Sequence, residues 1–123
     1  MKYLILLFLF FLPYELLAQC VSSIPLNSSL SGTWVTSCAS THRTGKYAKY
    51  YTFTLSSSQQ VSITLESSKD TYLFLLQGSG ETGTVITSND DIATGNTNSQ
   101  IVRTLTAGTY TAEATTYDSA TTG

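Results

Sequence analysis

The strongest constraint on the fold is an alternation of apolar and polar residues with a period of two. From Tyr51 to Leu55, and again from Val61 to Leu65, each apolar residue is followed by Thr or Ser. Successive side chains of a strand point to opposite faces, so this period indicates strands with one buried and one exposed face. A polar stretch at 56–60 joins the two segments, and we interpret the pair as a β-hairpin.

The rest of the chain continues in short segments of the same kind. Residues 72–76 are apolar on both faces, as in a central strand of a sandwich. Residues 85–86 form a short strand, and residues 101–105 and 110–115 alternate again, with Gly108 available for a positive φ in the turn between them. Short strands separated by turn signals are typical of sandwiches and barrels. The predicted fold class is therefore all-β, an antiparallel β-sandwich.

The N-terminus resembles a secretory signal peptide over residues 1–18. Lys2 precedes an apolar run of about ten residues, and Ala18 offers the small residue that cleavage requires. The run is shorter than the ~20 residues that span a bilayer. A retained membrane anchor and lipidation at Cys20 are the alternatives; we disfavour the second because Gln19 is bulky for a lipoprotein site. We predict a secreted, extracellular protein with no membrane attachment after cleavage.

The two cysteines and the net charge further limit the kinds of protein that this chain can be. Cys20 and Cys38 are an even pair in an exported chain, which favours a disulfide that contributes about 3 kcal/mol by closing the intervening loop. Free thiols or a metal pair are the alternatives, but the chain lacks the Cys and His partners for a metal site. A net charge of −2 gives no basic excess for nucleic acid.

From Tyr47 onward, the order of the segments resembles the bacterial pre-peptidase C-terminal domain family. The resemblance rests on these pieces in sequence: YTFTL at 51–55, VSITL at 61–65, DTYLFL at 70–75, SNDD at 88–91, NSQI at 98–101 and LTAGTY at 105–110. It implies a compact β-sandwich attached to secreted proteases and other exported enzymes. It also implies that some relatives, in bacterial collagenases, bind collagen and carry structural calcium.

The resemblance also divides the chain and marks where it departs from the family. We expect a signal peptide at 1–18, an N-terminal arm with the disulfide at 19–45, and the sandwich at 46–123. The family pattern usually has one more strand after the glycine that is Gly123 here. We therefore expect a jelly-roll-like sandwich that lacks its last strand and so has an unpaired edge, and the chain as a fragment of a longer protein is an open alternative. Arg103 stands where the family often has an apolar residue, which suggests a salt bridge or an exposed edge.

Catalysis has little support in the sequence. His42 is the only histidine and lies in a polar stretch, so we interpret it as a solvated loop residue. No nucleophile, phosphate-loop or His-based metal motif is present. Asp90 and Asp91 are the nearest approach to a carboxylate pair, but adjacent strand residues point to opposite faces. We predict that the chain is not an enzyme.

Two groups of residues remain as candidate sites. Asp70, Asn89, Asp90 and Asp91 flank neighbouring segments, and their oxygen atoms suit calcium. We favour the simpler interpretation that the aspartates cap turns, with a calcium site as the alternative.

Tyr47, Lys49 and Tyr50 form the second group, an aromatic and basic stretch in which Tyr50 is expected to be exposed. An edge strand protected by lysines is the favoured interpretation, and a ligand-binding face is the alternative. The function we predict is a secreted non-catalytic accessory or adhesion domain that binds extracellular protein or polysaccharide, or that supports an exported enzyme. The alternatives are an independent carbohydrate-binding module and a fragment of a longer secreted hydrolase.

Overall fold

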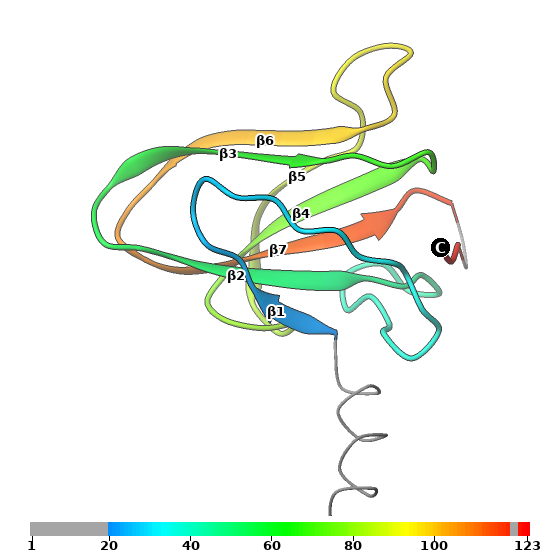
Figure 1. The fold of residues 1–123 in the computed structure, drawn as a ribbon, viewed down its shortest axis with the longest axis horizontal. Helices are drawn as coiled ribbons and strands as arrows, with labels where there is room; N and C mark the ends of the chain where they lie inside the picture. Colours follow the sequence, from blue (N-terminus) through cyan, green and yellow to red (C-terminus); the bar gives the residue numbers. More distant parts are fainter. Residues whose placement is uncertain (1–19, 119–120) are drawn as a thin grey trace, which may run out of the picture.

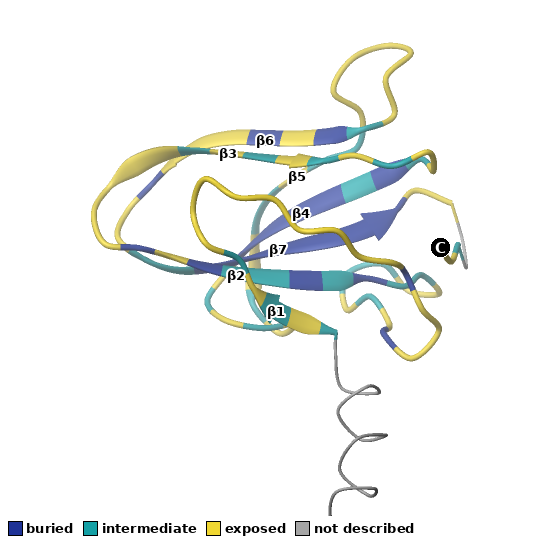
Figure 2. Cartoon of the chain, viewed as in Figure 1, coloured by how far each residue is buried: buried dark blue, intermediate teal, exposed yellow. Residues whose placement is uncertain are grey.

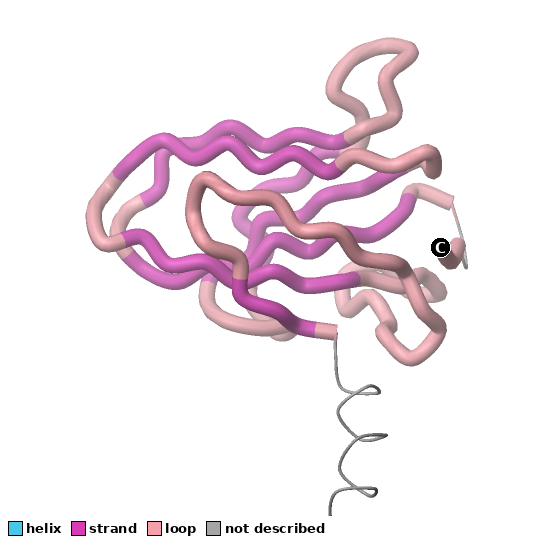
Figure 3. Tube along the Cα trace, in the orientation of Figure 1, coloured by secondary structure: helices cyan, strands magenta, loops and turns pink. Residues whose placement is uncertain are grey.

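A computed structural model describes residues 20–118 and 121–123, and this part of the chain contains strands and loops without a helix (Figures 1 and 3). The strands are β1 (Val21–Ser23), β2 (Lys49–Leu55), β3 (Gln59–Leu65), β4 (Thr71–Gln77), β5 (Thr84–Asn89), β6 (Ser99–Leu105) and β7 (Gly108–Thr116). The predicted signal peptide at 1–18 lies outside the described residues. Over the described part, no helix is long and apolar enough to span a membrane.

The strands form two sheets that face each other. A five-stranded sheet has the order β1-β2-β7-β4-β5, and a two-stranded sheet pairs β3 with β6. All pairs are antiparallel except β1 with β2, which is parallel. The all-β sandwich prediction is confirmed.

The predicted hairpin between β2 and β3 is wrong. β2 pairs with β1 and β7, whereas β3 pairs with β6 in the other sheet. The apolar faces of β2 and β3 meet across the core, where Phe53 and Leu55 belong to the same cluster as Val61 and Ile63. The two strands thus bury their apolar faces against each other by packing face to face, and they do not pair edge to edge.

The main core lies between the sheets and is built from the inward-facing residues of both. The alternation predicted for residues 101–105 is confirmed, because Ile101 and Leu105 are buried while Val102 is 54% exposed. Arg103 on the same strand is exposed. The buried members of the core cluster are Phe53, Leu55, Leu73, Leu75, Ile101, Leu105, Tyr110 and Ala112.

The outer face of the five-stranded sheet is also covered. A second cluster of buried residues, Ala48, Tyr50, Phe74 and Leu76, lies on this face. The loop at 38–47 packs over it, with main-chain bonds from Ala48 N to Cys38 O (2.9 Å) and from Ser40 N to Lys46 O (2.8 Å). As a result, β4 and β7 are buried on both faces (Figure 2). The alternation in β7 predicts a polar exposed face, and the structure instead buries Thr111, Glu113 and Thr115.

The predicted disulfide between Cys20 and Cys38 is confirmed. It ties the start of the described chain to the covering loop. Further along, Trp34 donates from its indole Nε1 to the main-chain oxygen of Ala114 at 2.8 Å in the interior. Gly108, the first residue of β7, has a φ of +150° where the chain turns from β6 into β7, as its predicted role requires.

Candidate functional site

An acidic corner lies at one end of the five-stranded sheet. Asp70 directly precedes β4, and Asp90 and Asp91 directly follow β5. Because β4 and β5 are antiparallel, the start of one meets the end of the other. One carboxylate oxygen from each aspartate lies within 4.8 Å of the other two.

The reasoning that Asp90 and Asp91 point to opposite faces is wrong. It assumed that both belong to a strand, but β5 ends at Asn89. Beyond that residue the strand alternation no longer applies, and the two carboxylates turn toward the same corner.

Buried hydroxyl groups hold the main chain of the acidic corner. Ser99 Oγ donates to the main-chain oxygen of Asp90 at 2.5 Å, and it lies 2.6 Å from Thr71 Oγ1. The side chain of Asn89, predicted as a fourth ligand, accepts a hydrogen bond from Gln100 N at 3.0 Å. Asn89 therefore connects β5 to β6, while the three aspartates form the cluster.

Two of the three carboxyl groups in the acidic corner have raised pKa values. Burial raises the pKa of Asp70 and of Asp90, and the neighbouring charge of Asp91 raises both further. Asp70 Oδ1 and Asp90 Oδ1 are buried without a hydrogen-bond partner among the described residues. Unpartnered buried carboxylate oxygens are costly. A set of carboxylate oxygens of this kind fits Ca²⁺, which prefers oxygen ligands.

A second cluster lies under the covering loop, around Glu113 of β7. The side chain of Glu113 is completely buried. His42 Nδ1 lies 2.6 Å from Glu113 Oε1, and Ser40 Oγ donates to Glu113 Oε2 at 2.5 Å. The interpretation of His42 as a solvated loop residue is wrong, because the ring pairs with Glu113 and lies 5.5 Å from the Phe74 ring.

Sequence reasoning missed Glu113 as a site residue. The available signal is that Glu113 is the one charged residue in β7, which otherwise holds apolar, Thr and Gly residues. A buried carboxylate needs partners, and the loop residues Ser40 and His42 provide them.

The covering loop is also held by Arg43. Its guanidinium lies 4.4 Å from the centre of the Tyr72 ring and 5.6 Å from that of Tyr117, and it donates to the main-chain oxygen of Tyr117 at 3.0 Å. Its charge opposes the rise in the pKa of Asp90. Arg43 thus connects the covering loop with the acidic corner.

The three residues predicted as a ligand-binding face do not share a surface. Tyr50 is completely buried, so its predicted exposure is wrong. Its hydroxyl accepts from Thr41 N at 2.9 Å and donates to Ala39 O at 3.0 Å, and burial raises its pKa. Tyr47 is half-buried, and Lys49, next to Tyr50 on β2, lines a groove on the other face of the sheet.

Together the fold and these clusters define a small β-sandwich domain tied by one disulfide, with an acidic corner. The family model for the bacterial pre-peptidase C-terminal domain matches residues 47–116. The chain belongs to this family, and the predicted resemblance is confirmed.

A solved structure supports the fold. It is a crystal structure of the pre-peptidase C-terminal domain of a collagenase from Bacillus anthracis, with a TM-score of 0.57 and 19% sequence identity. The match covers 80% of this chain and 84% of that chain. A search of curated proteins gave no match.

Proposed function

We propose that this chain is a non-catalytic accessory domain that binds an extracellular protein or polysaccharide or supports an exported enzyme. Its family occurs as accessory domains of secreted proteases. The disulfide agrees with an oxidising, extracellular location. The signal peptide at 1–18 is part of this proposal.

The non-catalytic role is supported mainly by the contacts of the His42 ring. A catalytic His accepts a proton from a nucleophile at one ring nitrogen while a carboxylate orients the other. Here Nδ1 faces both Glu113 Oε1 (2.6 Å) and Thr41 Oγ1 (3.0 Å). Ser40 is hydrogen-bonded to the carboxylate. These contacts support a role for His42 in anchoring the covering loop.

The acidic corner adds a calcium site to the proposal. Asp70, Asp90 and Asp91 would hold the ion, which would supply the positive charge that the two unpartnered carboxylate oxygens lack. Bound to the folded state alone, calcium stabilises the domain by mass action. Tyr117 is 49% exposed, and its main-chain nitrogen donates to Asp70 O at 3.0 Å, so it lies close to this corner. The Arg43 guanidinium lies 5.6 Å from the centre of its ring. An exposed aromatic ring with a polar end suits contact with a sugar, and it therefore favours polysaccharide as a partner.

The proposal is tested by unfolding and co-sedimentation of the purified protein. Millimolar calcium should raise Tm, EDTA should lower it, and Asp90→Asn should abolish the difference. Glu66→Gln, at the exposed residue that follows β3, should leave the difference intact. The protein should co-sediment with insoluble collagen or polysaccharide without hydrolysing it. An equal Tm in calcium and EDTA would remove the calcium site. Retention on neither polymer would remove the polymer-binding role, and hydrolysis of either polymer would refute the non-catalytic role.

A further inference from the structure

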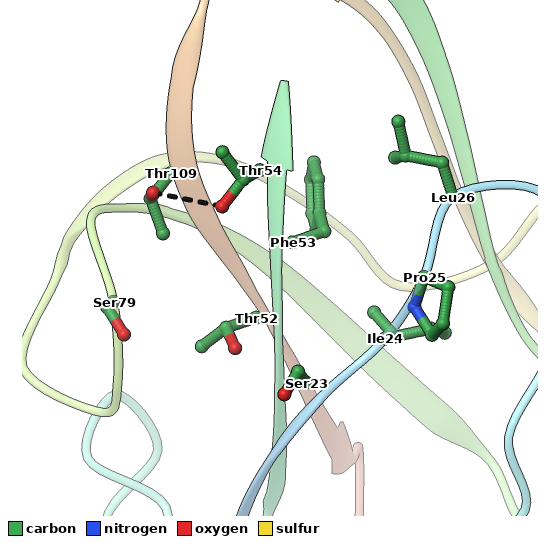
Figure 4. A pocket seen from close by; sticks show the side chains of 9 residues that line it. All are labelled: Ser23, Ile24, Pro25, Leu26, Thr52, Phe53, Thr54, Ser79 and Thr109. Atoms are coloured by element: carbon green, nitrogen blue, oxygen red, sulfur yellow. Dashed lines mark hydrogen bonds between the residues drawn. The ribbon is translucent and has the colours of Figure 1, made fainter. Parts of the chain in front are cut away.

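The two ends of the five-stranded sheet differ in charge. At one end, Thr54 Oγ1 lies 3.1 Å from Thr109 Oγ1, and the side chains that line the pocket around them are neutral (Figure 4). β7 starts at this neutral end and finishes at the acidic corner. Besides burial and the charge of Asp91, the charge of Asp118 raises the pKa of Asp70 there. Negative charge is therefore concentrated at one end of the sheet.

Arg43 is the cation that the covering loop brings to the acidic corner. Its guanidinium donates to the main-chain oxygen of Tyr117 and lies over the Tyr72 ring. Tyr117 N in turn donates to Asp70 O at 3.0 Å, so Tyr117 bridges Arg43 and the corner. Burial raises the pKa of Asp90, and the positive charge of Arg43 opposes that rise. The charge of Arg43 therefore acts on the carboxylates of the corner.

Arg43 nevertheless does not pair with these carboxylates. Among the described residues it forms no ion pair. Its Nε is buried without a hydrogen-bond partner, as are Asp70 Oδ1 and Asp90 Oδ1. The contacts with Tyr72 and Tyr117 keep the guanidinium away from the aspartates. The oxygen atoms of the corner therefore remain available to a cation from solution, which must bind against the positive charge of Arg43.

The main chain of the covering loop is folded around the same residue. Arg43 N donates to Ser40 Oγ at 3.0 Å, and Lys46 N donates to Arg43 O at 3.2 Å. The Ser40 hydroxyl also holds the buried carboxylate of Glu113. A shift of Arg43 would disturb these bonds, so the position of its side chain is linked to the packing of the loop.

We propose that Arg43 couples the acidic corner to the covering loop, so that it lowers the affinity of the corner for calcium, and bound calcium loosens the loop. Two cations near one set of carboxylates repel each other, and a coupling between two sites is reciprocal. The number of charges at a site is one of the terms that set its calcium affinity. This inference rests on the proposed function, because it assigns a regulation to the calcium site proposed there.

Calorimetric titration of the purified protein with calcium tests the effect on affinity. Arg43→Gln removes the charge and should bind calcium at least about threefold more tightly. Arg103→Gln removes the same charge from an exposed residue of β6, so it is the matched control and should bind like the unchanged protein. Arg43→Lys keeps the charge and should stay within about twofold of the unchanged protein. A merely structural role for Arg43 would lower Tm without tightening calcium binding.

Amide hydrogen exchange of the unchanged protein tests the effect on the loop and does not depend on whether a variant folds. Calcium should speed exchange of the Arg43 and Lys46 amides, and it should not speed exchange in β7. Equal affinity of Arg43→Gln and Arg103→Gln, or exchange of the two loop amides that is no faster in calcium, would overturn the role of Arg43 and leave the calcium site intact. If neither the unchanged protein nor any of these variants binds calcium, the calcium site is refuted, and this inference with it.

Discussion

Replacing His42 by alanine should destabilise the domain far more than the loss of a surface histidine. Glu113 Oε1 would lose a hydrogen-bond partner in the interior, which costs about 1–3 kcal/mol. The lost contact with the Phe74 ring adds roughly 0.5 kcal/mol. We therefore expect a loss of about 2–3 kcal/mol, equivalent to a Tm lower by roughly 8–24 °C for a domain of this size.

Urea unfolding at neutral pH measures this loss as a shift in midpoint at constant slope. A double-mutant cycle with Glu113→Gln isolates the pair, since glutamine keeps the shape of the side chain and removes its charge. We expect a coupling energy of at least about 1 kcal/mol between the two changes. A change within about 0.5 kcal/mol for His42→Ala, or additive effects in the cycle, would show that His42 is an ordinary surface residue and that the reasoning is wrong.

Three further changes should have measurable effects on unfolding. Cys20→Ser with Cys38→Ser should cost about 3 kcal/mol by releasing the loop they close, and a reductant should give the unchanged protein the same loss. In EDTA, Asp90 should stabilise the folded state below its unfolded-state pKa near 3.8, and this stabilisation should be lost as the pH rises through its raised folded-state pKa. A plot of the free energy of unfolding against pH should therefore be flatter for Asp90→Asn than for the unchanged protein. Parallel plots would contradict the raised pKa of Asp90. Trp34→Phe should cost about 1 kcal/mol in chemical unfolding, because the oxygen of Ala114 loses its donor.

The sequence was informative where one physical rule dominates. Alternation placed the strands and their inward residues, as at Ile101 and Leu105, because burial of one face fixes side-chain direction along a strand. The even cysteine count predicted the disulfide. The antiparallel meeting of β4 and β5 was enough to bring Asp70 and Asp90 together.

The failures come from contacts between distant parts of the chain. Alternation does not say whether β2 pairs with β3 or packs against it, since both bury the same residues. Nor does it reveal that a loop covers the outer face of the sheet. That loop turns Tyr50 from an exposed residue into a buried one and gives Glu113 its partners His42 and Ser40, which lie about seventy positions away in the sequence. The types of residue in the loop and in the strands do not predict that the loop packs over the sheet.

The disulfide also decides how the domain carries mechanical load. Tension applied at Cys20 passes through the disulfide to Cys38. The main-chain oxygen of Cys38 accepts a hydrogen bond from Ala48 N, which directly precedes β2. β1 and the arm that follows it lie within the loop that the disulfide closes, so this route bypasses them. A pull on the N-terminal side therefore bears on the central sheet and does not peel the N-terminal arm from the sandwich.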